Sequence, residues 1–480
     1  MTPELKALLP LLVIGATILA VMLADTFVPP GRRVILAVLS GLGVAVAMVA
    51  ALLATQEVGP ARLFHDTVAV DAFSLFFDVL FLGLALLVLM LAPGYLERRG
   101  IHVGEFYVLL LCALAGMMVL AAATSLMTVF IGVELLSIAL YVLSGFLRSE
   151  ERSQEAALKY LLIGGFASGF LLYGMALLYG ATGSTSIPVI TAALPHLAGD
   201  NLAFAVMGIA LVMVGLAYKA SAAPFHTWTP DVYEGAPAPV VAFMSVGTKV
   251  AAVAAFLRVF VAGLAPFQSR WAVMLGGVAA ISMLVGAVGA LRQINLKRLL
   301  AYSSIAHAGY LLLAVVAGGR AGLVSGAFYL GSYALMTFGA FGVVTLLAGP
   351  GEEGLSLNTL RGLGYRIPAA GALMALFMLS LAGFPPTVGF MGKLFVFEAV
   401  IGAGYAPLAV VAVTSSVISI YYYLKVVAVI YTRPESPTSE RTLDPWGMAA
   451  VGFVGILTLV LGVFPSLLYD LAQKAATGVA

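Results

Sequence analysis

The sequence predicts an all-α polytopic membrane protein with about 14 transmembrane helices, two of them discontinuous, in two inverted five-helix repeats. Hydrophobic residues make up 62% of the chain and charged residues only 10%, against roughly 25% charged residues in a soluble domain. This composition leaves no room for a separate soluble domain. Proline-bearing breaks in two apolar segments, and a recurring spacing between buried charges, predict the discontinuous helices and the repeats.

Each spanning helix needs about 20 apolar residues. The apolar segments are centred near residues 16, 44, 81, 115, 136, 168, 210, 250, 281, 307, 334, 382, 418 and 458. The first covers residues 7–24. It is longer than the apolar core of a signal peptide, which has about 7 to 15 residues, so we expect a permanent helix.

Two distances along the chain predict the internal repeat. Glu134 and Lys297 are 163 residues apart, and Pro224 and Pro386 are 162 residues apart. Five predicted spans separate the members of each pair, and an odd number turns the second copy upside down, as in inverted-repeat transporters. The predicted units are residues 1–104 (helices 1–3), 105–265 (helices 4–8, the first repeat), 266–433 (helices 9–13, the second repeat) and 434–480 (helix 14).

Two apolar segments contain helix-breaking prolines. YKASAAPFHTW carries Pro224, and GFPPTVGFMGK carries Pro385 and Pro386. Proline removes a backbone donor and clashes with the preceding turn, and open backbone at membrane depth persists only where it is enclosed by protein or lines a polar cavity. Lys219 lies just before the first break and Lys393 just after the second, which favours a functional site at each.

Ionisable residues expected at membrane depth are the candidate functional groups. They are Glu134, Lys159, Lys219, His226, Lys249, Lys297, His307 and Lys393, with Asp78, Glu105, Arg258 and Lys425 nearer helix ends. Each charge at a helix centre costs about 2.5 to 3.5 kcal/mol. A buried lysine gives up its proton more readily than an exposed one, and a nearby carboxylate opposes this. We therefore expect Glu134 to act on Lys219. The two histidines fit either proton relays or hydrogen-bonded core residues.

Basic residues in the loops predict that both termini lie outside, because loops retained in the cytoplasm are enriched in Lys and Arg. One set of alternating loops holds eleven: Arg32, Arg33, Arg98, Arg99, Arg148, Arg152, Arg292, Arg361, Arg366, Arg433 and Arg441. The other set holds five: Lys6, Arg62, Arg270, Arg320 and Lys474.

The sequence contains no visible fuel site, redox centre or metal site. Its single cysteine, Cys112, excludes intramolecular disulfides, Cys-ligated iron–sulfur clusters and Cys-based zinc sites. The one G-x-G-x-x-G match, residues 349–354, follows a membrane span and carries two glutamates where a pyrophosphate would lie. Moving one charge against the membrane potential costs about 2.3 kcal/mol per 100 mV. The energy must therefore come from another ion's gradient or from a partner subunit, and nothing indicates a nucleic-acid partner.

Four segments resemble the antiporter-like membrane subunits of respiratory complex I. They are GVELLSIALYVLSGFLR around Glu134, YKASAAPFHTWTPDVYEGAPAPV around Lys219, LRQINLKRLLAYSSIAHAGY around Lys297 and LSLAGFPPTVGFMGKLFVF around Lys393. Within the family the closest resemblance is to the subunit N group of NADH-quinone oxidoreductase. Subunit M typically has glutamate at the position of Lys393, and subunit L typically continues into a long lateral helix.

The resemblance implies one proton-translocating module of an NADH:quinone oxidoreductase, an enzyme of the translocase class, with helices 7 and 12 discontinuous. In it Glu134 and Lys219 would be the coupling pair and Lys393 the terminal lysine. The full implied relay is Glu134, Lys219, Lys249, Lys297, His307 and Lys393, with Lys159, Glu105 and His226 secondary.

The same resemblance implies that this chain binds no cofactor, because flavin, iron–sulfur clusters and quinone belong to partner subunits. The expected partners are the antiporter-like subunit M, small membrane subunits and the lipid bilayer, in a bacterial inner (plasma) membrane. One alternative is a subunit of an Mrp-type multi-subunit Na⁺/H⁺ antiporter, which would run on a sodium gradient. Another is an inactive scaffold bundle, which would gain nothing from the desolvation cost of buried lysines.

Overall fold

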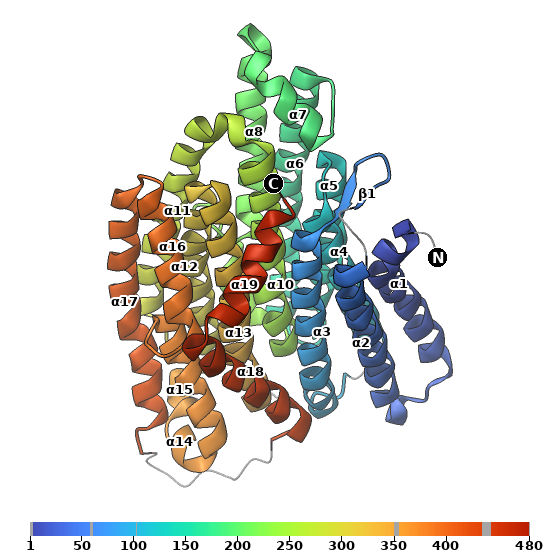
Figure 1. Ribbon diagram of the computed structural model, residues 1–480. Coiled ribbons are helices and arrows are strands. Elements are labelled where there is room, and N and C mark those ends of the chain that lie inside the picture. The colour runs from blue at the N-terminus through green and yellow to red at the C-terminus, as the bar shows by residue number, and fades with distance from the viewer. Residues whose placement is uncertain (1–2, 58–60, 102, 350–354, 434–442, 480) are drawn as a thin grey trace.

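The computed structural model describes residues 3–57, 61–101, 103–349, 355–433 and 443–479. Figure 1 shows a bundle of long helices with one small β-hairpin toward its upper end. In the described part of the chain, thirteen helices are long and apolar enough to cross a membrane. Two shorter helices, α15 (Pro368–Ala382) and α16 (Val388–Gly402), account for the fourteenth predicted span. Arg441, the boundary at 433/434 and most of the G-x-G-x-x-G match lie outside the described residues.

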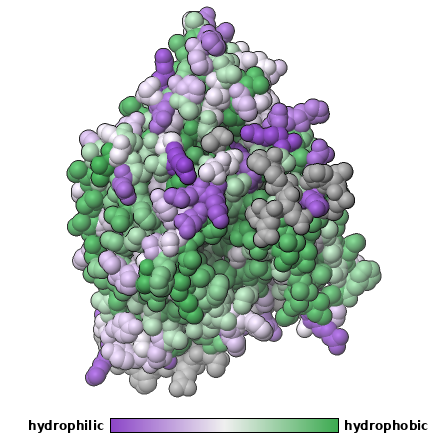
Figure 2. Space-filling model, viewed as in Figure 1, coloured by the Kyte–Doolittle hydropathy of each residue, from purple (hydrophilic) through white to green (hydrophobic). Residues whose placement is uncertain are grey.

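The surface of the bundle suits a lipid environment. Figure 2 shows hydrophobic side chains, in green, over most of the visible sides of the molecule, and the strongly hydrophilic ones gather mainly toward its upper part. Large apolar side chains such as Leu19, Phe166 and Val273 are exposed. Backbone polar groups within these helices bond internally, which is what a membrane-spanning segment requires.

The N-terminal group holds three long helices and the hairpin. Its elements are α1 (Pro3–Phe27), η1 (Pro30–Arg32), α2 (Val34–Glu57), β1 (Ala61–Leu63), β2 (Val68–Val70) and α3 (Ala72–Arg98). The strands, which the sequence did not predict, pair antiparallel with Ala61 opposite Val70. Asp71 begins α3 with a capping box, because its carboxylate accepts from Ser74 N at 2.8 Å while Ser74 Oγ accepts from Asp71 N at 3.0 Å.

The two predicted repeats supply the rest of the bundle apart from its C-terminal end. Residues 105–265 contain α4 (Glu105–Ala122), α5 (Leu126–Ser144), α6 (Glu151–Thr182), α7 (Ile187–Ala193), η2 (Leu194–His196), α8 (Gly199–Lys219), α9 (Trp228–Gly235), α10 (Ala238–Phe256) and η3 (Leu257–Gly263), a π-helical segment; η4 (Ala265–Phe267) begins at the boundary. Residues 266–433 contain α11 (Gln268–Leu291), α12 (Leu296–Ala317), α13 (Gly319–Leu347), η5 (Leu357–Leu360), α14 (Leu363–Arg366), α15 (Pro368–Ala382), α16 (Val388–Gly402) and α17 (Ala406–Ile430).

The C-terminal part consists of two helices where the sequence predicted one. These are α18 (Pro445–Val463) and α19 (Ser466–Thr477), separated at Pro465. α19 packs against α3 and α13, and Figure 1 shows it rising over the front of the bundle. It therefore joins the N-terminal group to the second repeat.

Both helix breaks predicted from the prolines are present. α8 ends at Lys219 and α9 begins at Trp228, while α15 ends at Ala382 and α16 begins at Val388. The peptide bonds before Pro224 and Pro386 are both cis. Each break leaves helix-end carbonyls without an intrahelical partner, so side chains must supply donors there.

The two predicted repeats share a feature at the start of their second helix. This feature gives a way to pair residues of the first repeat with residues of the second. Isolated β-bridges join Ser125 to Ser186 and Asn295 to Ser356, and the first residue of each bridge caps α5 or α12. Figure 1 places α7 at the upper end of the bundle and α14 at the lower end, opposite one another.

Counting along α5 and α12 from these caps changes one predicted pairing. Glu134 lies nine residues after Ser125, and Ser304 lies nine residues after Asn295. Ser304, rather than Lys297, therefore corresponds to Glu134. The two caps are 170 residues apart (295 − 125), so a spacing of 163 residues aligns the helices seven residues, about two turns, out of register.

Candidate functional site

Lys219 is the last residue of α8, at the edge of the first break. Its side chain is 2% exposed. The Nζ donates to Ser137 Oγ at 2.6 Å and to the hydroxyl of Tyr141 at 3.2 Å, both on α5. It also lies 5.3 Å from the ring centre of Tyr141 and 5.8 Å from that of Tyr160, where the π faces attract a cation. The Nζ of Lys219 is thus surrounded by uncharged groups, which can accommodate either the charged ammonium or the neutral amine.

Glu134 lies one turn before Ser137 on α5 and is half-buried. Its carboxylate accepts a short hydrogen bond from Ser168 on α6. In the described part of the chain no salt bridge joins Glu134 to Lys219, although the two charges interact electrostatically. The predicted pair is therefore not in direct contact: Lys219 bonds Ser137, whereas Glu134 bonds Ser168 and lies nearer the outside of the bundle than the lysine.

Lys249 lies at the centre of the molecule. α10 is enclosed along its whole length, and Lys249 is 0% exposed. Its Nζ has no hydrogen-bond partner among the described residues. A buried, unpartnered amine is expensive, so this position calls for a functional explanation.

Lys297 and His307 both lie on α12 but have different surroundings. The Nζ of Lys297 donates to the carbonyl oxygen of Ala236 at 2.7 Å, just beyond the end of α9. His307 is 1% exposed, and its Nδ1 and Nε2 lie 2.8 Å and 3.2 Å from the hydroxyls of Tyr329 and Tyr423. His307 is therefore a hydrogen-bonded residue inside a polar network, a geometry that serves a core residue and a relay equally.

A line of hydroxyls connects α12 to the helix of Lys249. Ser304 and Tyr333 share a hydrogen bond of 2.7 Å, and the Tyr333 hydroxyl donates to the carbonyl oxygen of Ser245 at 3.1 Å. Ser245 lies four residues before Lys249 on α10. The Tyr333 ring also lies beside His307, with 5.6 Å between ring centres.

Lys393 lies on α16, and its side chain reaches back to the second break. Its Nζ donates to the carbonyl oxygen of Ala382 at 2.9 Å and to Ser416 Oγ at 3.0 Å, and it lies 5.2 Å from the ring centre of Tyr310. Gly383, which ends α15 with φ of +91°, passes beside it. The break therefore exposes a carbonyl that the lysine satisfies.

Two of the three secondary candidates lie away from this line. Glu105 is exposed at the start of α4. The Lys159 side chain is 38% exposed and forms salt bridges with Glu155 at 2.6 Å and Asp231 at 2.7 Å. Arg298 binds the same Asp231 at 2.7 Å. Lys159 thus belongs to a surface cluster around α9, not to the buried interior.

His226, the third secondary candidate, lies within the first break and is half-buried. Its Nδ1 is buried without a hydrogen-bond partner in the described part of the chain. His226 is therefore part of the first break but is not among the groups that bond Lys219.

Sequence reasoning missed an ion pair and most of the hydroxyl network. Arg258, expected near a helix end, is 4% exposed and binds both carboxylate oxygens of Asp71 at 2.8 Å. A signal was present in the tyrosines of α13 and α17, which recur on helices that are otherwise apolar.

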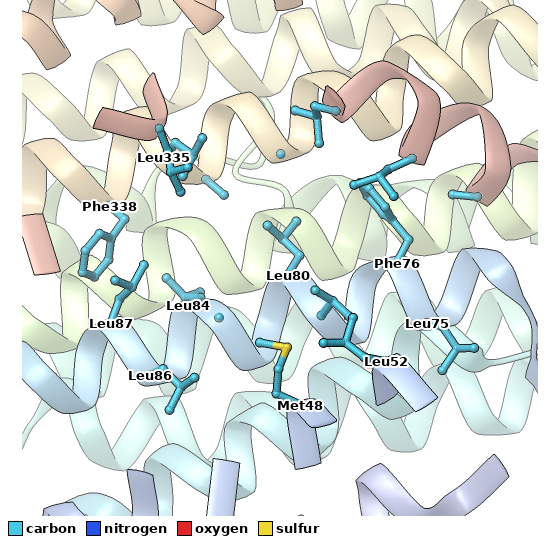
Figure 3. Close-up of a pocket in the computed structure, with 18 of the residues that line it drawn as sticks. Met48, Leu52, Leu75, Phe76, Leu80, Leu84, Leu86, Leu87, Leu335 and Phe338 are labelled. Atoms are coloured by element: carbon cyan, nitrogen blue, oxygen red, sulfur yellow. The ribbon is translucent and has the colours of Figure 1, made fainter. Parts of the chain in front are cut away.

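A separate open space lies away from these polar groups. A cavity of about 1210 Å³ is bordered by α2, α3, α13, α18 and α19. Figure 3 shows Leu80, Leu84 and Leu335 among its apolar lining. None of the predicted relay residues lines it, so the candidate site is a buried series of polar groups rather than a pocket.

Comparisons with known proteins identify the family. The family described as "NADH:quinone oxidoreductase/Mrp antiporter, TM" matches residues 123–419. The chain is 41% identical over 479 residues to NADH-quinone oxidoreductase subunit N of Trichlorobacter lovleyi, covering 99% of this chain and 97% of that protein.

Two solved structures share the fold. A chain of respiratory complex I from Thermus thermophilus has 37% identity and a TM-score of 0.83, covering 97% of this chain and 99% of that one. A chain of the Mrp complex from Dietzia sp. DQ12-45-1b has 24% identity and a TM-score of 0.86, covering 99% and 97%. At that identity the second match concerns the fold alone.

Proposed function

This chain belongs to the NADH:quinone oxidoreductase/Mrp antiporter family, in its group of NADH-quinone oxidoreductase N subunits, and from that premise we propose how protons cross it. Its function is that of a proton-translocating membrane subunit of that complex. The proposed path is the buried relay of Glu134, Lys219, Lys249, Lys297, His307 and Lys393.

Lys249 is the observation that carries the proposal. It is 0% exposed on a fully enclosed helix, and its Nζ has no partner among the described residues. A structural lysine would have a carboxylate or a carbonyl to bind, since an unpaired buried charge is strongly destabilising. A lysine that alternates between neutral and charged forms must not be held in the charged form by a fixed partner.

The other lysines supply the ends of the path. Lys219 and Lys393 each border a helix break, where freed backbone groups and hydroxyls can exchange partners with an ammonium group. The link from α10 to α12 runs through Ser245, Tyr333 and Ser304. Protons would move between lysines along such hydroxyls and through water.

Glu134 is proposed as the input. Its carboxylate stabilises the charged form of Lys219, and a charge change in a neighbouring subunit would weaken that influence. Lys219 would then release its proton toward Lys249, and the charge would pass on to Lys297 and Lys393. This coupling is supported by the half-buried position of Glu134 on α5, one turn before Ser137, which bonds Lys219.

We include four further statements in the proposal. The chain itself holds no redox centre or cofactor, and the parent enzyme is of the translocase class. Subunit M and small membrane subunits are its neighbours. Both termini lie on the outer face of a bacterial inner membrane. The unit boundaries at 104/105, 265/266 and 433/434 delimit the two repeats.

An Mrp-type Na⁺/H⁺ antiporter subunit is the alternative function, because the family description that matches the chain also covers Mrp antiporters. That function requires a sodium-dependent proton flux without NADH or quinone. Neighbouring genes for flavin, iron–sulfur and quinone-site subunits would support the complex I assignment, and a run of small antiporter genes would support the alternative.

The experiment replaces Glu134 and each of the four buried lysines with alanine in the reconstituted complex and measures NADH-driven proton pumping. Lys474→Ala, on the exposed face of α19, is the control. The proposal expects pumping to fall in each relay variant at equal amounts of assembled complex, and to persist in the control. Normal pumping in Lys219→Ala, Lys249→Ala and Lys393→Ala would reject the relay.

A further inference from the structure

A second group of buried charges lies where α3 packs against α10. The two guanidinium nitrogens of Arg258 bind the carboxylate oxygens of Asp71 at 2.8 Å each, and its Nε donates to the carbonyl oxygen of Ala121 at 2.9 Å. Both charged side chains are at most 5% exposed. The hydrogen-bonding capacity of Arg258 is thus largely taken up by Asp71 and the end of α4.

A second carboxyl group, Asp78, lies two turns further along α3. Asp78 is 9% exposed, and its Oδ1 is buried without a hydrogen-bond partner among the described residues. The charges of Asp71 and Arg258 both act on it. Two carboxylates and one guanidinium leave an uncompensated negative charge, which is costly inside a membrane protein. One bound proton makes this cluster neutral.

The packing of the two helices places Asp78 near the level of Lys249. Asp71 contacts Arg258 at one end of the interface, and Leu84 packs on Gly247 further along, where an added Cβ would lie 3.5 Å from its Cδ2. The helices therefore run in opposite directions over this stretch, about 20 Å of α3. Asp78 lies between the two contacts.

The position of the cluster relative to the membrane follows from the loops. Arg98 is the last residue of α3 and Arg99 follows it, and both belong to the basic set assigned to the inside. Asp71 therefore marks the outer end, and Asp78 lies on the outer side of Lys249. Arg258 also lies in the π-helical segment η3, and such irregularities within helices are frequent at functional sites.

We propose that Asp78, together with the Asp71–Arg258 ion pair, is a proton-binding site on the outer side of Lys249. Asp78 holds a proton while the cluster is neutral and releases it outward when positive charge reaches Lys249. The ionised carboxylate then takes a proton back from Lys249, which restores both groups. This inference rests on the proposed function and extends it to a group outside the predicted relay.

The test compares Asp78→Asn with Asp78→Glu in the reconstituted complex, and measures NADH-driven proton pumping at equal amounts of assembled complex. Asp470→Asn, whose carboxylate is exposed on α19, is the matched control. The amide cannot exchange a proton, so Asp78→Asn should lose most of the pumping, while Asp78→Glu and the control retain it. Infrared difference spectra should lose a protonated-carboxyl band in Asp78→Asn alone.

Normal pumping in Asp78→Asn would overturn the proposal. So would equal losses in Asp78→Asn and Asp78→Glu with reduced assembly, because a packing role would then explain both. If Asp78→Asn pumps normally while Lys249→Ala does not, the proton site fails and the relay stands. If both pump normally, the relay itself fails.

Discussion

The Nζ of Lys393 lies 2.9 Å from the carbonyl oxygen of Ala382, the residue at which α15 ends. The break before α16 frees this oxygen, and the lysine that satisfies it comes from the helix on the other side of the break. The same hydrogen bond thus joins the two halves of the discontinuous helix and anchors the terminal lysine. A change in the protonation of Lys393 would therefore change the strength of its hydrogen bond to the backbone at the break.

Gly383→Ala should disturb Lys393. The glycine has φ of +91°, and a Cβ there would lie 3.1 to 3.3 Å from Lys393 Cδ and Nζ. A side chain at positive φ costs about 1–2 kcal/mol, so assembled complex should be less thermally stable. Proton pumping should fall as well, because the lysine must move.

Gly404→Ala is the control for this change. Gly404 has φ of +88° with nothing within 4 Å of the added Cβ, so it should show the loss of stability without the loss of pumping. Equal pumping in the two variants would argue against a role for the position of Lys393.

Ser137→Ala should disturb Lys219, which we propose responds to Glu134. The substitution removes the 2.6 Å acceptor of the Lys219 Nζ, and a hydrogen bond to a charged group contributes about 1.5–3 kcal/mol. Pumping should fall, with a smaller effect on assembly. Ser40→Ala is the control, because Ser40 is equally buried and its Oγ bonds only the carbonyl of Leu36 in its own helix. An unchanged pumping rate in Ser137→Ala would contradict this link.

Tyr423→Phe should impair the relay at His307. It removes the hydroxyl 3.2 Å from Nε2 while keeping the ring, so packing is conserved. Tyr160→Phe is the control, since its hydroxyl is buried without a hydrogen-bond partner among the described residues and its ring still faces Lys219. We expect reduced pumping in the first variant and normal pumping in the second. Normal pumping in Tyr423→Phe would favour His307 as a core residue.

Lys159→Ala should affect pumping less than Lys219→Ala. Lys159 pairs with two carboxylates in a half-exposed cluster, and exposed pairs contribute about 0–1 kcal/mol and are screened by salt. Measuring both variants at low and high ionic strength checks this. If Lys159→Ala abolished pumping at every salt concentration, the surface cluster would have to be part of the path.

The sequence predicted the number of spans and both breaks because bilayer thickness and proline chemistry leave direct marks on composition. It also predicted that Lys219, Lys249, Lys297 and Lys393 are buried. It did not predict what they contact, since the hydroxyl of Tyr141 or the carbonyl of Ala236 becomes a partner only through packing between distant helices.

Other features could not be recognised for related reasons. Lys159 precedes a long apolar run but follows several charged residues, and α6 places it beside Glu155 and Asp231 at the surface. Asp71 and Arg258 are 187 residues apart, and only the packing of α3 on α10 brings them together. The sequence placed Arg258 near a helix end and gave no indication of Asp71 as its partner.

The central claim is that Lys249 carries a proton, and Lys249→Met tests it most directly. Methionine fills a similar space without charge, and because the Nζ has no partner in the described residues, its removal leaves no buried group unsatisfied. The measurement is NADH-driven proton pumping by the reconstituted complex at equal amounts of assembled protein. We predict a complex that assembles at least as well as the native one and does not pump through this subunit. Pumping at the native rate by Lys249→Met would contradict the account.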